Sequence, residues 1–256
     1  MSIQEGTNLD LRDLLVRQRV RTCSLSLPAT VAWFAAAELV TFALVFAENI
    51  GAAWSGWRGI SLVPFVHLQL LLHGVAGVLV VLAIRQVRGD PWRYLAVTRP
   101  TGWDVFRGIG WGLGTLIAAV GITLTVMTPS PLPGAHNWAA GIMDPVDKFA
   151  IAGTVAFWTI VAAPVSEEMI YRGLLYRGLV NSGIGTLGAI LLSALAFGLA
   201  HKVGGWGWDK VVFTTILGLV LGFLRWRNGS LTIPMIAHMA FNFPSSLTEF
   251  LRLLNA

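Results

Sequence analysis

Three short polar patterns lie inside strongly hydrophobic stretches of the 256-residue chain. They are Glu167-Glu168-x-x-x-Arg172, Phe197-x-x-x-His201 and His238-x-x-x-Asn242. Carboxylates, imidazoles, an amide and a guanidinium are costly to place in a bilayer, so such groups indicate a functional site. A carboxylate near an imidazole can activate water, and an imidazole with an amide can stabilise the oxyanion formed when that water attacks a carbonyl. The residue types therefore favour hydrolysis of a peptide bond in or beside the membrane.

The first pattern predicts different roles for its two neighbouring glutamates. Residues 165–180 fit a helix, on which adjacent side chains point about 100° apart. Arg172 follows Glu168 by four residues, the spacing at which opposite charges meet on a helix, so we expect these two to form a structural ion pair. Glu167 then faces elsewhere and is available as a general base. The alternative is an interfacial helix end whose acids are favoured by the helix dipole.

The other two patterns each place an imidazole one helical turn from a possible partner. Phe197 lies four residues before His201 and can pack on its ring, which would fix the direction of the imidazole. His238 and Asn242 share one face of the last apolar segment as a pair of hydrogen-bond donors. Taken singly, His201 could be an interfacial histidine, and the His238–Asn242 pair could simply join helices. Because lipid offers none of these groups a partner, we expect all three patterns to converge in one interior polar cavity.

The elements that position these residues are predicted to be membrane-spanning helices. The chain is 55% hydrophobic and only 12% charged, with a mean hydropathy of +0.69, whereas a soluble domain carries about 25% charged residues. Apolar stretches that we predict to span the membrane lie near residues 29–53, 61–84, 105–127, 149–164, 184–200, 211–226 and 230–246. The last four are short for a spanning helix, which needs about 20 residues. Residues 165–180 also fit a helix, and Pro164 is expected to kink or interrupt the chain before them. The predicted fold is an all-α polytopic bundle of seven or eight helices.

The apolar segments are spread almost from end to end, which favours one membrane domain. We predict a cytoplasmic N-terminal segment at residues 1–28, a single membrane domain at 29–246 with its catalytic core at about 149–246, and a C-terminal tail at 247–256. The only cysteine is Cys23, so the chain has no internal disulfide and no thiolate metal cluster.

The net charge of +5 comes from arginines beside apolar spans, which is typical of cytoplasmic loops that face anionic lipid headgroups. The sequence lacks the basic and aromatic groove pattern of a nucleic-acid-binding protein, so no nucleic acid is expected as a partner. Alternation of the predicted spans puts most arginines on one side of the membrane: Arg12, Arg17, Arg19, Arg21, Arg85, Arg88, Arg93, Arg99, Arg107, Arg172, Arg177, Arg225 and Arg227. By the positive-inside rule this side, and the N-terminus with it, is cytoplasmic.

In this order and on helical segments, the EExxxR, FxxxH and HxxxN patterns resemble the CPBP family. This family comprises the CAAX prenyl endopeptidases and related bacterial bacteriocin-processing or self-immunity proteins. The resemblance covers residues of about 165–245 and implies an α-helical intramembrane protease with a cavity open toward the cytoplasm. It also implies a bacterial cytoplasmic membrane as the location, and a membrane-associated protein or peptide as the substrate, with CAAX-type prenylated proteins as one class.

Carried over by position, Glu167 and His201 resemble the water-activating pair of this family, and His238 and Asn242 resemble its oxyanion stabilisers. Glu168 and Arg172 complete the first motif, and Phe197 begins the second. Tyr171 stands where the family often has phenylalanine, and its hydroxyl needs a hydrogen-bond partner that the sequence does not identify.

A zinc-dependent reaction is an alternative, because Glu167, His201 and His238 are also plausible ligands of zinc. The metal-free version is favoured, since a glutamate-activated water needs no metal and an asparagine suits an oxyanion hole better than a ligand shell. Two further alternatives are a non-catalytic immunity or adaptor protein on the same scaffold and a small transporter with a proton relay. A transporter would show inverted repeats, but the polar groups lie in one half of the chain.

Other polar residues within the first two spans are set aside from the site. Glu38, Glu48, His67 and His73 are interpreted as interior hydrogen-bonding or interfacial residues, with lining of the cavity as the alternative.

Overall fold

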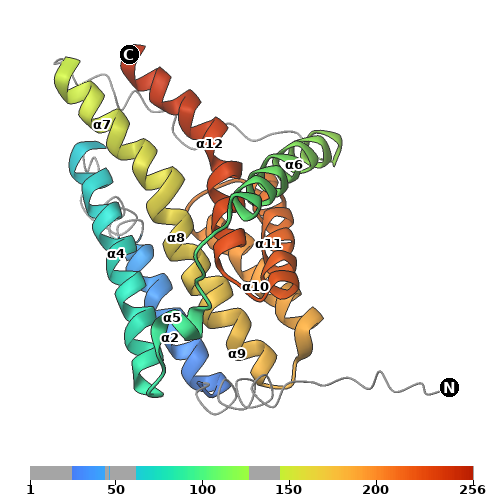
Figure 1. Cartoon of the computed structure of the whole chain (residues 1–256). Coiled ribbons are helices and arrows are strands. Elements are labelled where there is room, and N and C mark those ends of the chain that lie inside the picture. The colour runs from blue at the N-terminus through green and yellow to red at the C-terminus, as the bar shows by residue number, and fades with distance from the viewer. Residues whose placement is uncertain (1–24, 44–45, 47–61, 127–144, 256) are drawn as a thin grey trace.

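The computed structural model describes residues 25–43, 46, 62–126 and 145–255, which are helical without any strand (Figure 1). Its outer helices are α2 (Leu27–Thr41), α4 (Leu62–Gln86), α5 (Pro91–Leu95), α6 (Gly102–Val126), α10 (Gly185–Val203), α11 (Trp208–Asn228) and α12 (Thr232–Asn255). One further long helix combines α7 (Pro145–Phe157), η2 (Trp158–Ala162), α8 (Ala163–Glu168), η3 (Met169–Leu175) and α9 (Tyr176–Asn181). The predicted all-α bundle of seven or eight helices is confirmed.

Among the residues that the structure describes, four helices are long and apolar enough to cross a membrane: Val66–Gln86, Gly102–Thr125, Lys148–Asn181 and Gly185–Val203. The chain is therefore an integral membrane protein. Helix α2 is apolar but only 15 residues long, and the predicted continuation of the first span toward residue 53 lies outside the described residues. Helices α11 and α12 are present where spans were predicted, yet they carry more polar residues and fall outside this apolar set.

The central helix runs unbroken past Pro164, so the predicted fourth span and the helix at 165–180 are one element. A proline in an α-helix lacks an N–H and clashes with the carbonyl four residues earlier. Here the turn before it, η2, is a π-helix, whose bonds reach five residues back. The wider turn accommodates Pro164 without ending the helix, and a second π-helical segment, η3, follows the two glutamates.

The central helix separates two groups of outer helices (Figure 1). On one side α2 packs against α4, and both contact the central helix. On the other side α10 pairs with α11 and α6 pairs with α12. The largest apolar core surrounds η3, where Ile170 and Leu174 pack with Leu221 and Leu231, all four fully buried. The core therefore encloses the helix that carries the first polar pattern.

The predicted end of the last span, residue 246, lies in the middle of α12, which continues to Asn255. Leu253 explains the extension, because it is buried against Ile151, Ala152 and Val155 of α7 in a second apolar cluster. The division of the chain into one membrane domain and two terminal segments stays a prediction.

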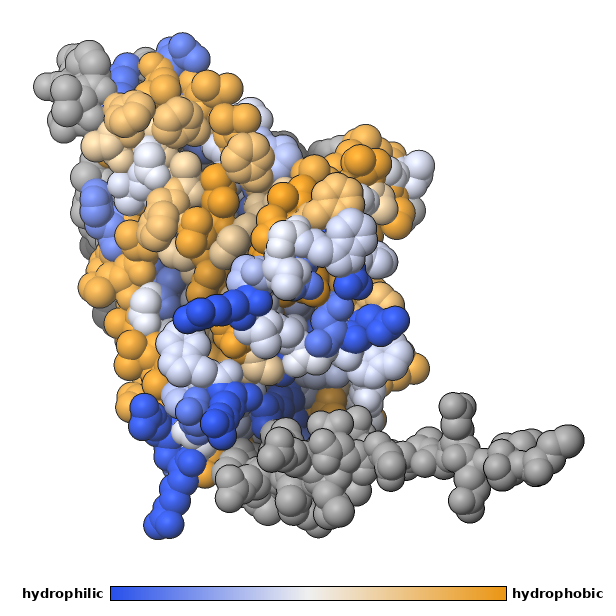
Figure 2. Space-filling view, viewed as in Figure 1, coloured by the Kyte–Doolittle hydropathy of each residue, from blue (hydrophilic) through white to orange (hydrophobic). Residues whose placement is uncertain are grey.

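Several predicted loop arginines lie at the end of the bundle where α4 ends and α12 begins. There the N–H of Leu231 donates to the carbonyl of Ala96 at 3.1 Å, and Arg177 donates to the carbonyl of Tyr94. Figure 2 shows hydrophilic residues gathered over the lower part of the molecule and apolar residues over most of the rest. The orientation of the bundle in the membrane stays a prediction.

Arg172 and Arg225, which were predicted to belong to loops on the cytoplasmic side, are not solvated cations. Arg172 is fully buried and Arg225 is 7% exposed. Arg225 donates to the carbonyls of Arg172, at 3.5 Å, and of Gly229, so it ties the end of α11 to the central helix. The sequence could not separate these two from their neighbours, because burial of a guanidinium depends on carbonyls that only the tertiary structure supplies.

Two glycines allow α6 and α12 to approach closely. A Cβ atom added at Gly112 would lie 2.2 Å from the carbonyl oxygen of Ala237, and one added at Gly108 would lie 2.6 Å from a side-chain carbon of Ile236. Small residues at four-residue spacing let membrane helices pack backbone to backbone. Because Ala237 immediately precedes His238, this contact determines where the imidazole lies.

We expect Gly112→Ala to push α12 away from α6, which should destabilise the protein by about 1–3 kcal/mol as an overpacked core does. The matched control is Gly110→Ala on the same helix, where an added Cβ would meet nothing within 4 Å. Thermal unfolding of both variants in the same detergent compares them. Equal unfolding temperatures would contradict the close approach.

Candidate active site

The predicted ion pair of the first pattern is present and fully buried. Arg172 Nη1 lies 2.7 Å from Glu168 Oε1, and neither side chain is exposed. The same guanidinium donates through Nη2 to the carbonyl of Gly218 on α11 at 3.0 Å. Burial of a charge is tolerated when it is paired and hydrogen-bonded. The guanidinium therefore joins the Glu168 carboxylate of the central helix to the backbone of α11.

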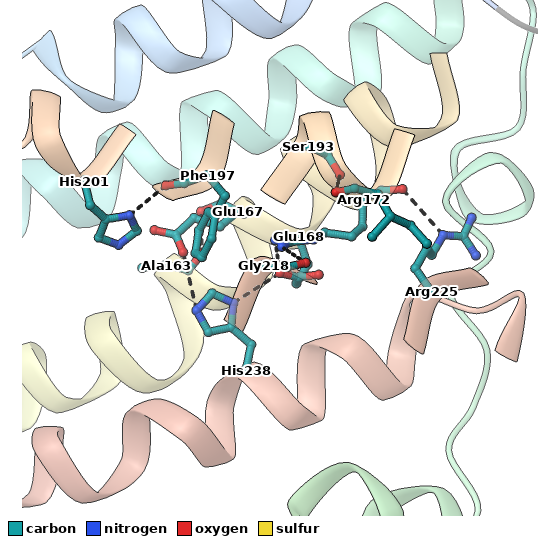
Figure 3. Close-up of polar contacts among 12 residues, drawn as sticks. Ala163, Glu167, Glu168, Arg172, Ser193, Phe197, His201, Gly218, Arg225 and His238 are labelled. Atoms are coloured by element: carbon teal, nitrogen blue, oxygen red, sulfur yellow. Dashed lines mark hydrogen bonds and ion pairs between the residues drawn. The ribbon is translucent and has the colours of Figure 1, made fainter. Parts of the chain in front are cut away.

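His238 of α12 lies between the two glutamates (Figure 3). Its Nδ1 is 3.2 Å from Glu168 Oε1, and its Nε2 is 3.6 Å from Glu167 Oε2. An ionised carboxylate only accepts hydrogen bonds, so Nδ1 carries a hydrogen and Nε2 is the nitrogen directed toward Glu167. Glu168 thus has a second role that the sequence analysis missed: it orients the imidazole as well as pairing with Arg172.

His201 is fixed by its own helical turn. Its Nδ1 lies 2.9 Å from the carbonyl oxygen of Phe197, which can only accept, so Nδ1 is the donor and Nε2 of the neutral ring is left as an acceptor. The two rings pack edge to face with centroids 4.9 Å apart. This confirms the predicted packing of Phe197 on His201.

Phe197 is the ring around which the site is assembled. It is 1% exposed, and its centroid lies 5.6 Å from that of His238 and 4.8 Å from the guanidinium carbon of Arg172. Both imidazoles therefore contact the same aromatic ring, and Figure 3 shows the Glu167 side chain between them in this view. The side chain of Glu167 is 20% exposed, whereas that of Glu168 is fully buried. The structure thus brings Glu167, His201 and His238 together, as predicted.

Asn242 lies one turn beyond His238 on α12, and its amide is turned toward the central helix. Its Nδ2 donates to the carbonyl oxygen of Thr159 in η2 at 3.0 Å. An amide nitrogen carries two hydrogens, so one remains for a further acceptor. Helical spacing predicts that Asn242 lies beside His238, but Thr159 is distant in sequence and no spacing rule indicates it.

Two residues that the sequence analysis set aside also reach this region. Glu38 of α2 is hydrogen-bonded to Tyr171, which identifies the partner of that hydroxyl. His73 of α4 is buried, and its Nδ1 lies 2.7 Å from Oγ of Ser166, the residue before Glu167. Both were correctly interpreted as interior hydrogen-bonding residues. Only sequence-distant contacts link them to the site, so no spacing rule could have found them.

The zinc-dependent alternative would use Glu167, His201 and His238 as ligands. Within the part of the chain that the structure describes, no three His, Cys, Asp or Glu side chains are arranged to hold a metal ion. The ring nitrogens of His238 are instead directed at two carboxylates. Metal dependence is left to experiment.

The segment that carries these residues matches a known protein family. Residues 150–244 match the family model of the type II CAAX prenyl endopeptidases, Rce1-like. This match confirms the family resemblance. The Rce1-like segment covers less than half of the chain but contains all seven residues of the three polar patterns, and it ends two residues after Asn242. The family indicates a protease-type hydrolase. No curated protein and no solved structure matches the chain.

Proposed function

We propose that the protein is an intramembrane endopeptidase that cleaves a membrane-associated protein or peptide with a water molecule activated by Glu167. The observation that carries the proposal is the placement of Glu167 against His238 at 3.6 Å, beside a second imidazole on the same phenylalanine ring. The match of residues 150–244 to the Rce1-like family supports the same reaction class.

In the proposed reaction Glu167 takes a proton from water, and the resulting hydroxide attacks the scissile carbonyl carbon. The Nε2 acceptor of His201 orients the water, because Nδ1 already donates to the carbonyl of Phe197. The oxyanion is stabilised by the imidazole of His238 and by the second amide hydrogen of Asn242. The tetrahedral intermediate then collapses: its C–N bond breaks, and Glu167 passes its proton to the leaving nitrogen. All four residues come from the Rce1-like segment.

The membrane location follows from four apolar helices; a bacterial cytoplasmic membrane with a cytoplasmic N-terminus is part of the proposal. Prenylated CAAX-type proteins are the first substrate class to test, because the family model is named for them. Membrane lipids surround the bundle as its other partner. Proteomics of membrane fractions from cells that express the wild type or Glu167→Gln tests the proposal: peptides cut only in the wild type support it, and identical peptide sets refute it.

The proposed chemistry uses only protein groups, so we expect chelation to leave cleavage unchanged. Purified protein is treated with a strong chelator, and its cleavage rate and its zinc content are measured before and after treatment. A stoichiometric metal whose removal abolishes cleavage, with recovery on adding zinc, would establish the zinc-dependent alternative.

A further inference from the structure

The amide of Asn242 is held by a carbonyl group that Pro164 leaves without a helical partner. In η2 the backbone bonds reach five residues back, and the N–H of Ala163 donates to the carbonyl of Trp158 in this way. The next bond of the series would run from residue 164 to the carbonyl of Thr159. Proline has no N–H, so that bond cannot form, and Nδ2 of Asn242 donates to this oxygen instead, at 3.0 Å.

Thr159 is attached to α12 at a second point. Its hydroxyl lies 2.8 Å from Oγ of Ser246, one helical turn beyond Asn242, and also donates to the carbonyl of Val155 at 2.8 Å. Because that hydroxyl hydrogen is already used, Ser246 is the donor of the contact with Thr159. Carbonyl and hydroxyl of one residue thus contact two successive turns of α12, which determines how α12 lies against η2.

The contact also determines which way the Asn242 amide points. A backbone carbonyl only accepts hydrogen bonds, so the atom that faces Thr159 must be Nδ2 and not Oδ1. With one amide hydrogen held, the plane of the amide is fixed and the direction of its second hydrogen is defined. An oxyanion donor needs such a fixed direction, since its effect depends on being aligned before the charge develops.

We propose that Pro164 and Thr159 are positioning residues for the oxyanion donor Asn242. The π-helical turn followed by proline leaves the carbonyl of Thr159 without a backbone donor, so that the amide of Asn242 can bind it. The proposal rests on the proposed function for the catalytic role of Asn242, but the contact itself can be tested separately. Neither residue touches the substrate in this account; both act through the amide of Asn242.

Pro164→Ala tests the proposal, because it restores an N–H that competes for the carbonyl of Thr159. We expect kcat to fall on the order of 10²-fold, the effect of a small misplacement of a catalytic group, while KM changes little. In the Asn242→Ala background the same substitution should cost no further activity. The control is Pro234→Ala in the first turn of α12, where a helix has no internal partner for the N–H.

A second measurement does not depend on activity. In protein labelled with ¹⁵N-asparagine, the side-chain signal of Asn242 is identified by its loss in Asn242→Ala, and we expect it to shift in Pro164→Ala and not in Pro234→Ala. If the Asn242 signal is unchanged in Pro164→Ala, the proposal is overturned. It is also overturned if Pro164→Ala lowers the activity by the same factor in the wild type and in Asn242→Ala. If the wild type cleaves nothing, the proposed function fails, yet a shifted signal still supports the positioning contact.

Discussion

Glu167→Gln is expected to lower the cleavage rate by about 10²- to 10⁴-fold, the contribution of a general base to a proton-transfer step. Glutamine keeps the size and the hydrogen-bonding capacity of the side chain but cannot accept the proton of water. Since Glu167 is not part of the buried pair of Glu168 and Arg172, the substitution should leave the unfolding temperature close to that of the wild type. Rates are measured in proteoliposomes with a peptide found in the proteomic comparison.

Glu249→Gln is the matched control. Glu249 lies on α12 and not on the central helix. Its side chain is 39% exposed and pairs with Arg252 at the surface, so its loss should not change cleavage. A Glu167→Gln protein that cleaves at the wild-type rate would refute the proposed general base. Wild-type phenotypes in cells for both Glu167→Gln and His201→Ala would favour the non-catalytic immunity or adaptor protein instead.

Helical spacing was enough to predict the contacts within one segment. The pair of Glu168 with Arg172 and the packing of Phe197 on His201 are both four-residue contacts, and they are determined by the local helix. The contacts between segments could not be predicted in this way. That His238 lies between both glutamates depends on how α12 packs against the central helix, and that packing depends on close approaches such as the one at Gly112.

An all-helical bundle of seven or eight helices could be predicted from hydropathy, because apolar stretches of bilayer length are rare in other proteins. The residues at which the helices end could not be predicted in this way. Pro164 is a strong helix-interrupting signal, yet a π-helical turn accommodates it, and this turn has no recognised sequence signature in the chain. Likewise α12 extends past residue 246 because Leu253 is buried against α7, a tertiary contact that hydropathy does not report.

Arg172→Met should destabilise the protein by about 3–5 kcal/mol, the cost of leaving one partner of a buried ion pair without its counter-charge. Both side chains are fully buried, and the substitution also removes the donor to the carbonyl of Gly218. Thermal unfolding in detergent, followed by tryptophan fluorescence, measures the loss. Arg252→Met is the control: its ion pair with Glu249 is partly exposed and should contribute about 0–1 kcal/mol.

The double variant Glu168→Met with Arg172→Met separates the two roles of Glu168. Replacing both partners of a buried pair by apolar side chains of similar volume is often neutral for stability, so the unfolding temperature should recover toward that of the wild type. Cleavage should not recover, because Nδ1 of His238 has then lost the carboxylate that lies 3.2 Å away and orients the ring. A double variant that regains both stability and cleavage would show that Glu168 acts only through Arg172. Recovery of stability alone assigns Glu168 to the catalytic arrangement as well as to the scaffold.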